Sequence, residues 1–342
     1  MSPKTIKRVC LTPQVSGVGG MVSFSAKLTD GLAKKGIQTT FNLTDEQTDA
    51  VLVIGGTRQL VSLRRITRRD IPVVQRLDGM NWLHRRLRTG ARHWLRAEIG
   101  NSLLAYIRER IANKIVYQSH FVQNWWGRVY GPGPSNNRII YNGVDLDLFR
   151  PDKANQPPKD RICILMVEGN MGGGYELGIE SAVTLAEALQ TGKNSVELII
   201  AGQVDAKLSA KWGQKSRVSI DWVGVIPNNQ LPQLYGKAHL LFSGDLNAAC
   251  PNSVIEAMAC GLPVIAFDTG ALSELVTESA GKVIPYGGDP WKLDAPDMFP
   301  LVEGASEILT DQLSFRAAAR AHAEQAFSLD RMVEAYIGAM SG

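Results

Sequence analysis

Glu256 lies in the stretch of the chain whose residue types and spacing are best suited to chemistry. Pro251 and Asn252 can start a helix just before it. We predict Asn252 as the N-cap, because an asparagine side chain accepts a hydrogen bond from the free amides of a first turn. Such a helix end attracts a phosphate or another anion. Glu256, one turn inside, can accept hydrogen bonds from a vicinal diol such as a ribose. The alternative is that Glu256 is an ordinary helix residue whose side chain is exposed to solvent.

The apolar pattern predicts the elements that hold this glutamate. Apolar residues recur at helical spacing after Asn252, Gly261 ends the helix, and Pro263 prevents its continuation. Residues 264–267 form a short apolar run that is typical of a strand buried on both faces. The stretch from residue 247 to 274 is therefore predicted as loop, helix, turn, strand and loop.

Two further glycine-rich loops follow predicted strands. In the first, Gly19 and Gly20 let the backbone approach a phosphate or a sugar closely, although a tight turn alone is an alternative. This loop is not a dinucleotide fingerprint, because its third glycine would fall on Val22. The second loop, residues 170–175, lies between a strand and a helix predicted over residues 176–189, where backbone amides can cradle an anion.

Composition sets the class of protein. The 342 residues are enough for two domains, and 44% hydrophobic with 20% charged residues is typical of a soluble globular protein. No apolar run is long enough to span a bilayer, and the first residues lead straight into a strand rather than a signal peptide. The four scattered cysteines lack metal-ligand spacing and are interpreted as reduced thiols of a cytoplasmic protein.

The net charge of +4 is unevenly spread. Eleven arginines lie between residues 58 and 96, where Asp70 and Asp78 alone oppose them, and this predicts an anionic partner for the first half of the chain. Arginines interleaved with tryptophans suit a membrane interface or a basic groove for a phosphate-bearing acceptor. An ordinary surface helix is the alternative, and nucleic acid is not expected because no binding module is recognised. The residues assigned to this acceptor or membrane face are Arg85, Arg86, Arg88 and Arg92.

Asp78 ends a strand predicted within residues 71–79. A strand-end aspartate in a cleft can act as a base or bind an acceptor hydroxyl, and it is as often a turn-former. Asp78 is therefore the catalytic candidate.

Residues 253–266 resemble the donor-site motif of retaining GT-B glycosyltransferases of family four, the glycosyl transferases group 1. Asn142-Gly-Val-Asp145, with Phe149 and Pro151 after it, resembles the interdomain passage of the same family. In that family two glutamates lie eight positions apart. The first contacts the donor sugar and the second contacts the ribose. Glu256 matches the second, whereas Ala248 stands at the first.

The resemblance implies an α/β, GT-B fold of two Rossmann-like, doubly wound domains facing across a cleft. The expected ranges are 1–150 for the acceptor-side domain, 151–325 for the nucleotide-sugar domain and 326–342 for a terminal helix that returns toward the first. The tail from residue 312 to 340 is predicted to be helical. The donor-binding residues implied are Gly19, Gly20, Asn170, Gly172, Gly173, Asn252, Ser253, Val254 and Glu256.

The implied function is transfer of a sugar, with retention, from a nucleotide-diphosphate sugar to a glycan or lipid-linked acceptor. Cell-surface polysaccharide or glycolipid synthesis is the usual setting, either in the cytoplasm or peripherally at the inner membrane face. Neither a cofactor nor a metal is implied. The family's usual arginine and lysine for the leaving diphosphate fall on Asn170 and Gly173. These losses, with Ala248, motivate the alternative of a degenerate protein that binds nucleotide or glycan without turnover. A dinucleotide-dependent oxidoreductase is excluded, because the glycines near Gly19 do not have the spacing of a dinucleotide-binding loop.

Overall fold

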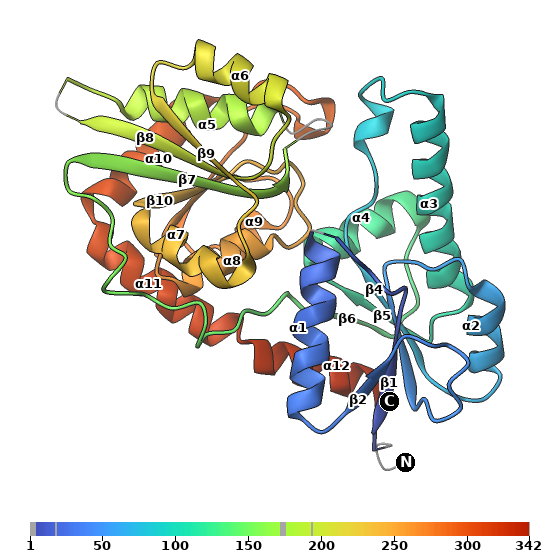
Figure 1. The fold of residues 1–342 in the computed structure, drawn as a ribbon. Helices are drawn as coiled ribbons and strands as arrows, with labels where there is room; N and C mark the ends of the chain where they lie inside the picture. Colours follow the sequence, from blue (N-terminus) through green and yellow to red (C-terminus); the bar gives the residue numbers. More distant parts are fainter. Residues whose placement is uncertain (1–4, 18, 172–175, 193, 342) are drawn as a thin grey trace. The chain divides into compact units, whose positions relative to one another are not determined.

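The computed structural model describes residues 5–17, 19–171, 176–192 and 194–341, and the chain forms two compact units (Figure 1). Unit 1 comprises Met1–Gly143 with Leu329–Gly342, and unit 2 comprises Val144–Ser328. The division after Gly143 lies ahead of the expected boundary at residues 150/151. The reason is that Phe149 is already part of unit 2: its carbonyl accepts from Arg320 Nη1 at 2.8 Å and its ring packs on Tyr235.

Unit 1 is built on a six-stranded parallel sheet in the order β2-β1-β3-β4-β5-β6. Its four central strands, β1, β3, β4 and β5, are largely buried, as a covered parallel sheet requires, whereas the edge strands β2 and β6 are polar and partly exposed. The strand predicted within residues 71–79 is present as β4. The strands are β1 (Arg8–Thr12), β2 (Gln38–Thr40), β3 (Ala50–Ile54), β4 (Val73–Leu77), β5 (Lys114–Tyr117) and β6 (Asn137–Ile139).

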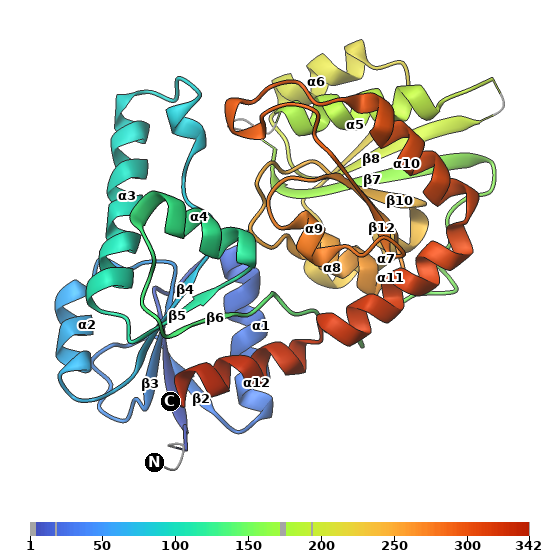
Figure 2. The ribbon, with the colours of Figure 1, turned by 180° about the vertical axis from the view of Figure 1, so that it is seen from behind.

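Helices cover both faces of the unit 1 sheet, and Figures 1 and 2 show them from opposite sides. α1 (Gly20–Lys34) and α12 (Leu329–Met340) share one apolar core with the sheet, and α2 (Leu60–Thr67) and α3 (Ala91–Arg110) share the other. The remaining helical segments are η1 (Leu83–Arg85) and α4 (His120–Tyr130). The predicted serine cap of α4 is confirmed, because Ser119 accepts from the Val122 amide at 3.2 Å.

Unit 2 repeats the same architecture. Its parallel sheet has the order β12-β11-β10-β7-β8-β9, which is the Rossmann order counted from β7. The strands are β7 (Arg161–Asn170), β8 (Ser195–Gln203), β9 (Ser219–Gly224), β10 (Leu240–Ser243), β11 (Val264–Phe267) and β12 (Gly281–Ile284). The predicted strand at residues 264–267 is confirmed.

The helices of unit 2 lie on both faces of its sheet (Figure 2). α5 (Glu176–Leu189), as predicted from the sequence, α6 (Ala206–Lys215) and α10 (Met298–Thr310) share a core with one face. On the other face α8 (Asn252–Ala259) packs against α11 (Gln312–Ala326) and α7 (Leu231–Lys237). The other helical segments are η2 (Asn228–Gln230), α9 (Leu272–Leu275) and η3 (Pro290–Lys292).

The C-terminal tail, predicted to be helical over residues 312–340, forms two helices, α11 and α12. α11 ends where the Phe327 amide bonds the Ala323 carbonyl, and the next residue, Ser328, forms a parallel bridge with Val144. This extended pairing interrupts the helix. After it, α12 joins unit 1, where Gly31 gives it room: a Cβ at that position would lie 2.3 Å from Val333 Cγ2.

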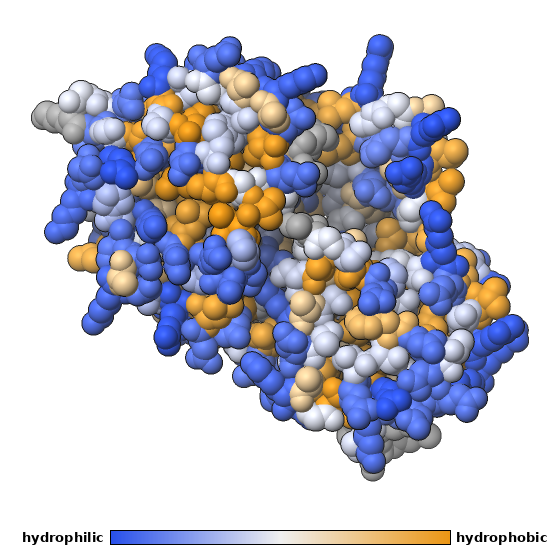
Figure 3. All heavy atoms as spheres, in the orientation of Figure 1, coloured by the Kyte–Doolittle hydropathy of each residue, from blue (hydrophilic) through white to orange (hydrophobic). Residues whose placement is uncertain are grey.

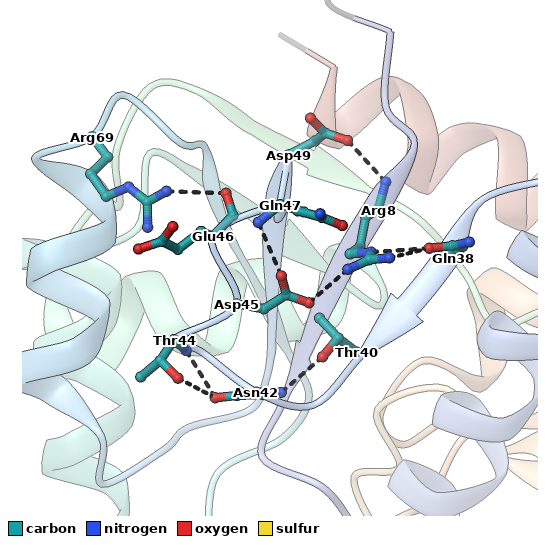
Figure 4. Close-up of polar contacts among 10 residues, drawn as sticks. All are labelled: Arg8, Gln38, Thr40, Asn42, Thr44, Asp45, Glu46, Gln47, Asp49 and Arg69. Atoms are coloured by element: carbon teal, nitrogen blue, oxygen red, sulfur yellow. Dashed lines mark hydrogen bonds and ion pairs between the residues drawn. The ribbon is translucent and has the colours of Figure 1, made fainter.

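A polar network ties together the amino ends of the unit 1 strands (Figure 4). Asp49 Oδ2 accepts from the backbone amides of Lys7 and Arg8, at 2.8 and 2.9 Å. The Arg8 guanidinium bonds Gln38 Oε1 and lies 3.1 Å from Asp45 Oδ2. The network therefore fixes β1 against β2 and against the loop that enters β3.

The surface in Figure 3 is largely hydrophilic in both units, with apolar side chains in scattered groups. Over the described ranges, every helix is too short or too polar to cross a lipid bilayer.

We expect Asp49→Ala to lower the free energy of unfolding by about 1–2 kcal/mol, because two strand-end amides lose their acceptor. The urea midpoint measured by circular dichroism tests this. Glu46→Ala is the matched control, since Glu46 lies in the same loop with its side chain exposed, and it should leave the midpoint unchanged. Equal midpoints for both variants would contradict the role given to Asp49.

Candidate functional site

Each sheet reverses its strand order at one point, and α/β proteins bind ligands outside the carboxyl ends of the strands beside such a point. In unit 1 the reversal lies between β1 and β3, and in unit 2 it lies between β7 and β10. The residues predicted to bind the donor fall into two sets, one for each unit. Each set lies in segments that follow strands.

The first turn of α8 is the centre of the unit 2 set. α8 begins at Asn252, with Pro251 as its N-cap, and no side chain caps its first amides. The predicted capping role of Asn252 is therefore wrong: Asn252 is itself the first helical residue. Asn252 and Ser253 are half-buried and Val254 is fully buried. An uncapped first turn leaves amides free to bind an anion.

Glu256 is buried beneath this turn, with only 3% of its surface exposed. The Tyr235 hydroxyl donates to Glu256 Oε2 at 3.4 Å. Burial raises the pKa of Tyr235 well above its usual value, and the neighbouring Glu256 carboxylate raises it further. The interpretation of Glu256 as a solvated helix residue is wrong. A buried carboxylate needs donors, and ribose hydroxyls are donors of the right kind.

The loop between β10 and α8 is locked to the next strand-end turn. The Ala271 amide bonds the Ala248 carbonyl at 2.9 Å, and a Cβ on Gly270 would lie 2.4 Å from the Ala248 amide nitrogen. Asn247, with a φ of 58°, makes the bend that permits this approach. Ala248 is 4% exposed, so the position that carries a glutamate in the family is here a packed methyl group.

Two carboxylates that the sequence analysis did not select lie at the switch point of unit 2. Glu168 lies two residues before the end of β7 and Asp245 follows β10, and these strands are neighbours with Leu165 paired to Leu241. Burial raises the pKa of Asp245 to about 7. Burial, and then the nearby Asp245, raise the pKa of Glu168 well above its usual value. The available signal was an acid at the end of each apolar run, Met-Val-Glu168 and Phe-Ser-Gly-Asp245.

The second glycine-rich loop lies only partly within the described structure. Gly172 and Gly173 fall outside the described residues. Asn170 ends β7, where its backbone pairs with Gln203 of β8. Asn170 is thus the last residue of the strand, at the carboxyl edge of the sheet, rather than the first residue of the loop predicted over residues 170–175.

The unit 1 set lies at the other switch point. Gly19 precedes α1 with a φ of 137°, and no side chain caps the first turn of α1, which begins at Gly20. Nothing lies within 4 Å of a Cβ built on Gly19, so the backbone conformation, rather than space, requires glycine there. Asp78 follows β4 and is half-buried; burial raises its pKa and Arg76 lowers it. The Asp78 carbonyl accepts from Trp126 Nε1 at 2.8 Å.

The four predicted surface arginines of η1 and its neighbourhood are all exposed. Arg85 is paired, donating to Glu98 at 2.6 and 2.8 Å. Glu98 also bonds the buried His84 at 2.8 Å, so it fastens η1 to α3. The other three make no ion pair with described residues. Beside them α3 exposes Trp94, Leu95 and Ile99.

Arg76, counted in the basic segment from the sequence, is not on the surface. It is 1% exposed, lies 3.8 Å over the Phe24 ring and donates to Asn142 Oδ1 at 3.0 Å. Its position on β4 directs it under α1, so it takes no part in a surface charge.

A hollow of about 580 Å³ lies at the opposite, amino edge of the unit 1 sheet. It is lined by Arg8, Gln38, Thr40 and Asp45, among others. Because the Arg8 guanidinium already bonds Gln38 and Asp45 (Figure 4), the hollow offers no free charge to a ligand.

All four cysteines are free and buried. Within the described ranges, no three His, Cys, Asp or Glu side chains come together as ligands for one metal ion.

Residues 165–293, which include the second half of β7 and the whole of α8, match the family described as Glycosyl transferases group 1. D-inositol 3-phosphate glycosyltransferase 1 of Catenulispora acidiphila is 25% identical over 234 residues, 63% of this chain and 54% of its own length. The protein named D-inositol 3-phosphate glycosyltransferase in Acidothermus cellulolyticus is 21% identical over 202 residues, 52% of this chain and 45% of its own. The matched region thus spans about half the length of these curated relatives.

Solved structures share the fold of the whole chain. Sucrose-phosphate synthase from Thermosynechococcus elongatus superposes with a TM-score of 0.71 at 16% identity, over 96% of this chain and 97% of that one. Anabaena HepE, solved with UDP and glucose, gives 0.68 at 15% identity over 99% and 100%. WaaG, a glycosyltransferase of lipopolysaccharide biosynthesis, gives 0.68 at 15% over 98% and 100%.

Two Rossmann-like sheets with uncapped helix ends at their switch points define the class, which is a GT-B protein. Within that class, the chain is similar to the glycosyl transferases group 1 family over residues 165–293, a stretch that includes residues 253–266, where the resemblance was found.

The Glu98 cluster yields a pH-dependent prediction. Hydrogen bonds from Arg85 and then His84 lower the pKa of Glu98 from 4.5 to about 2. The stabilisation is therefore present above pH 4.5 and is lost as the pH falls toward 2. Because the pair with Arg85 is partly exposed, Glu98→Gln should cost at most about 1 kcal/mol at pH 7.

Urea unfolding at pH 7, 5, 4 and 3 measures this difference, which should shrink below pH 4.5. Glu278→Gln, an exposed glutamate of unit 2, is the control and should show no difference at any pH. A Glu98→Gln difference that stayed constant with pH would contradict the assignment.

Proposed function

We propose that the chain is a glycosyltransferase that takes a sugar from a nucleotide-diphosphate donor bound at the switch point of unit 2. The observation that carries the proposal is Glu256, a buried carboxylate one turn inside the uncapped end of α8. The helix end suits the diphosphate and the carboxylate suits the ribose diol. The match to the group 1 family covers this site, and structures of Anabaena HepE with UDP and UDP-glucose support the donor class.

The proposed transfer proceeds with retention and depends on electrostatic stabilisation of the departing diphosphate. Free amides at the first turn of α8 are one source of that stabilisation. In unit 1, the uncapped turn of α1 at Gly19 and Gly20 is a separate place where backbone amides suit an anion or a sugar. Asp78, half-buried after β4, is the proposed contact for an acceptor hydroxyl.

The acceptor in this proposal is a glycan or a lipid-linked molecule of the cell surface, reached by a cytoplasmic enzyme that associates peripherally with the membrane. The support is the exposed cationic surface of unit 1, in which Arg86, Arg88 and Arg92 flank Trp94 and Leu95. Arginines bind anionic headgroups while tryptophan and leucine enter the interface. The name of WaaG, which places it in lipopolysaccharide biosynthesis, agrees with such a setting.

The donor site is tested by hydrolysis of a panel of nucleotide sugars, with calorimetric binding of the free nucleotides. One donor should be hydrolysed, and Glu256→Ala should weaken binding of its nucleotide by about 10- to 100-fold through lost charged hydrogen bonds. Glu303→Ala, an exposed glutamate of α10, is the matched control and should bind normally.

Binding of a nucleotide without hydrolysis, even with acceptor extracts added, would favour the alternative of a protein that binds without turnover. Equal affinities for Glu256→Ala and the unsubstituted chain would contradict the ribose role of Glu256.

The membrane surface is tested by co-sedimentation with vesicles of phosphatidylglycerol or of phosphatidylcholine. The triple variant with glutamine at positions 86, 88 and 92 should lose about 100-fold in affinity for the anionic vesicles, since each arginine near the surface contributes about 1 kcal/mol. Arg65→Gln with Arg68→Gln, also exposed but on and after α2, should have a much smaller effect. Equal losses in both variants would argue against a defined membrane face.

A further inference from the structure

The hydroxyl of Tyr235 is buried against the carboxylate that the proposed donor site uses. Tyr235 lies on α7 and is fully buried, and Glu256 of α8 is 3% exposed. The Tyr235 hydroxyl donates to Glu256 Oε2 at 3.4 Å. This is long for a hydroxyl donor, and hydrogen bonds of binding sites often tighten once the ligand is present. The two side chains are therefore treated as one unit.

The direction of this hydrogen bond follows from the state of the phenol. Burial, and then the Glu256 carboxylate, raise the pKa of Tyr235 well above its usual value. The phenol therefore keeps its proton throughout the neutral range and acts as the donor. An ionised carboxylate only accepts, with about four lone-pair positions on its two oxygens. One phenol thus does not exhaust the acceptor capacity of Glu256, and a diol can use the remainder.

The ring of Tyr235 is held by the segment that leads into β7. Phe149 is fully buried, and its ring is tilted by 55° against the Tyr235 ring with the centroids 6.3 Å apart. Arg320 of α11 donates from Nη1 to the Phe149 carbonyl at 2.8 Å and to the Ala259 carbonyl at 2.7 Å. Ala259 is the last residue of α8. One guanidinium therefore fastens the residue that packs on Tyr235 to the helix that carries Glu256.

A second arginine of α11, Arg316, joins the carboxyl ends of the same two helices. Its Nη1 donates to the carbonyl of Gly261, just after α8, at 3.3 Å, and its Nη2 bonds the carbonyl of Ala238, just after α7. Cations suit helix carboxyl ends, where carbonyls lack intrahelical partners. Because α7 and α8 are both held to α11, the hydroxyl and the carboxylate are placed before a ligand arrives. Such preorganisation lowers the cost of binding.

We propose that Tyr235 is a positioning residue: it fixes Glu256 Oε2 so that the carboxylate selects donors with both ribose hydroxyls, ribonucleoside rather than 2′-deoxyribonucleoside diphosphate sugars. The inference rests on the proposed function, because Tyr235 acts through Glu256. A site built to hydrogen-bond a hydroxyl rejects an analogue that lacks it, since buried groups are then left unpaired. Without the phenol, the carboxylate is free to turn away from the diol, and the selection weakens.

Calorimetry of the full chain tests the proposal. UDP, GDP and ADP are titrated first, and the nucleotide that binds is then compared with its 2′-deoxy analogue. The unsubstituted chain should prefer the ribonucleotide by about 10- to 100-fold. Tyr235→Phe keeps the ring and removes the hydroxyl, so it should bind the ribonucleotide about tenfold more weakly and change the affinity for the deoxy analogue little. The ratio of the two affinities is a readout that a merely structural role would not move.

Tyr286→Phe is the matched control. Tyr286 is likewise a buried tyrosine of unit 2 that packs on an aromatic ring, that of Phe267. Its hydroxyl donates to the Asp294 carbonyl at 2.6 Å rather than to Glu256. This variant therefore also deletes a buried hydroxyl, and it should leave the ratio of affinities unchanged.

A double-mutant cycle shows whether Tyr235 acts through Glu256. Tyr235→Phe should weaken binding no further in a chain that already carries Glu256→Ala, because the group that it positions is gone. Circular dichroism checks folding. If Tyr235→Phe does not fold, Phe149→Leu replaces it: this variant keeps the phenol but loosens its ring, so the ratio should fall in the same direction.

An unsubstituted chain without preference for the ribonucleotide, a ratio unchanged in Tyr235→Phe, or an equal fall in Tyr286→Phe would overturn the proposal. If Glu256→Ala still weakened nucleotide binding in that case, the proposed function would stand and only the role of Tyr235 would fall. Absence of nucleotide binding under every condition would overturn both.

Discussion

The parallel direction of every strand is the constraint on which the rest of this structure depends. It gathers the strand-end loops of each sheet at one edge, and the reversal of strand order opens a place between two of those loops. In unit 2 that place lies between β7 and β10, and α8 begins from the loop that follows β10. Residues far apart in sequence, such as Glu168 and Glu256, are brought to the same region for this reason.

The carboxylates of Glu256, Glu168 and Asp245 are distinguished from ordinary surface acids by their burial. Glu256 is enclosed by α8 and the Tyr235 hydroxyl, and Glu168 and Asp245 are held at neighbouring strand ends. A charge removed from water is costly unless a partner satisfies it. The proposed nucleotide would add hydrogen bonds from its ribose hydroxyls to the Glu256 carboxylate.

Much of the architecture could be predicted from the sequence, because its strongest signals are local. The run at residues 264–267 and the helix at 176–189 were predicted correctly from apolar pattern and length alone. The capping role of Asn252 was not, since Pro251 takes the N-cap position and the backbone bends one residue earlier. The break in the tail at Ser328 could not be predicted either, because it depends on pairing with Val144, far away in the chain.

The site was predicted less completely than the fold, because it also depends on contacts between residues that are far apart in the sequence. Glu256 was found because its motif is contiguous. Asp245 and Glu168 were missed because their proximity follows from strand order, which no local pattern encodes. Arg76 was counted in the basic segment by composition, whereas its position on β4 buries it against Phe24. Exposure of an arginine follows from its element, not from its neighbours in sequence.

The most direct test of this account is a crystal structure of the chain with UDP. The account predicts the ribose within hydrogen-bonding distance of the Glu256 carboxylate, and the diphosphate at the carboxyl ends of β7 and β10. Nucleotide density elsewhere, for example in the hollow beside Arg8 at the amino edge of unit 1, would contradict it.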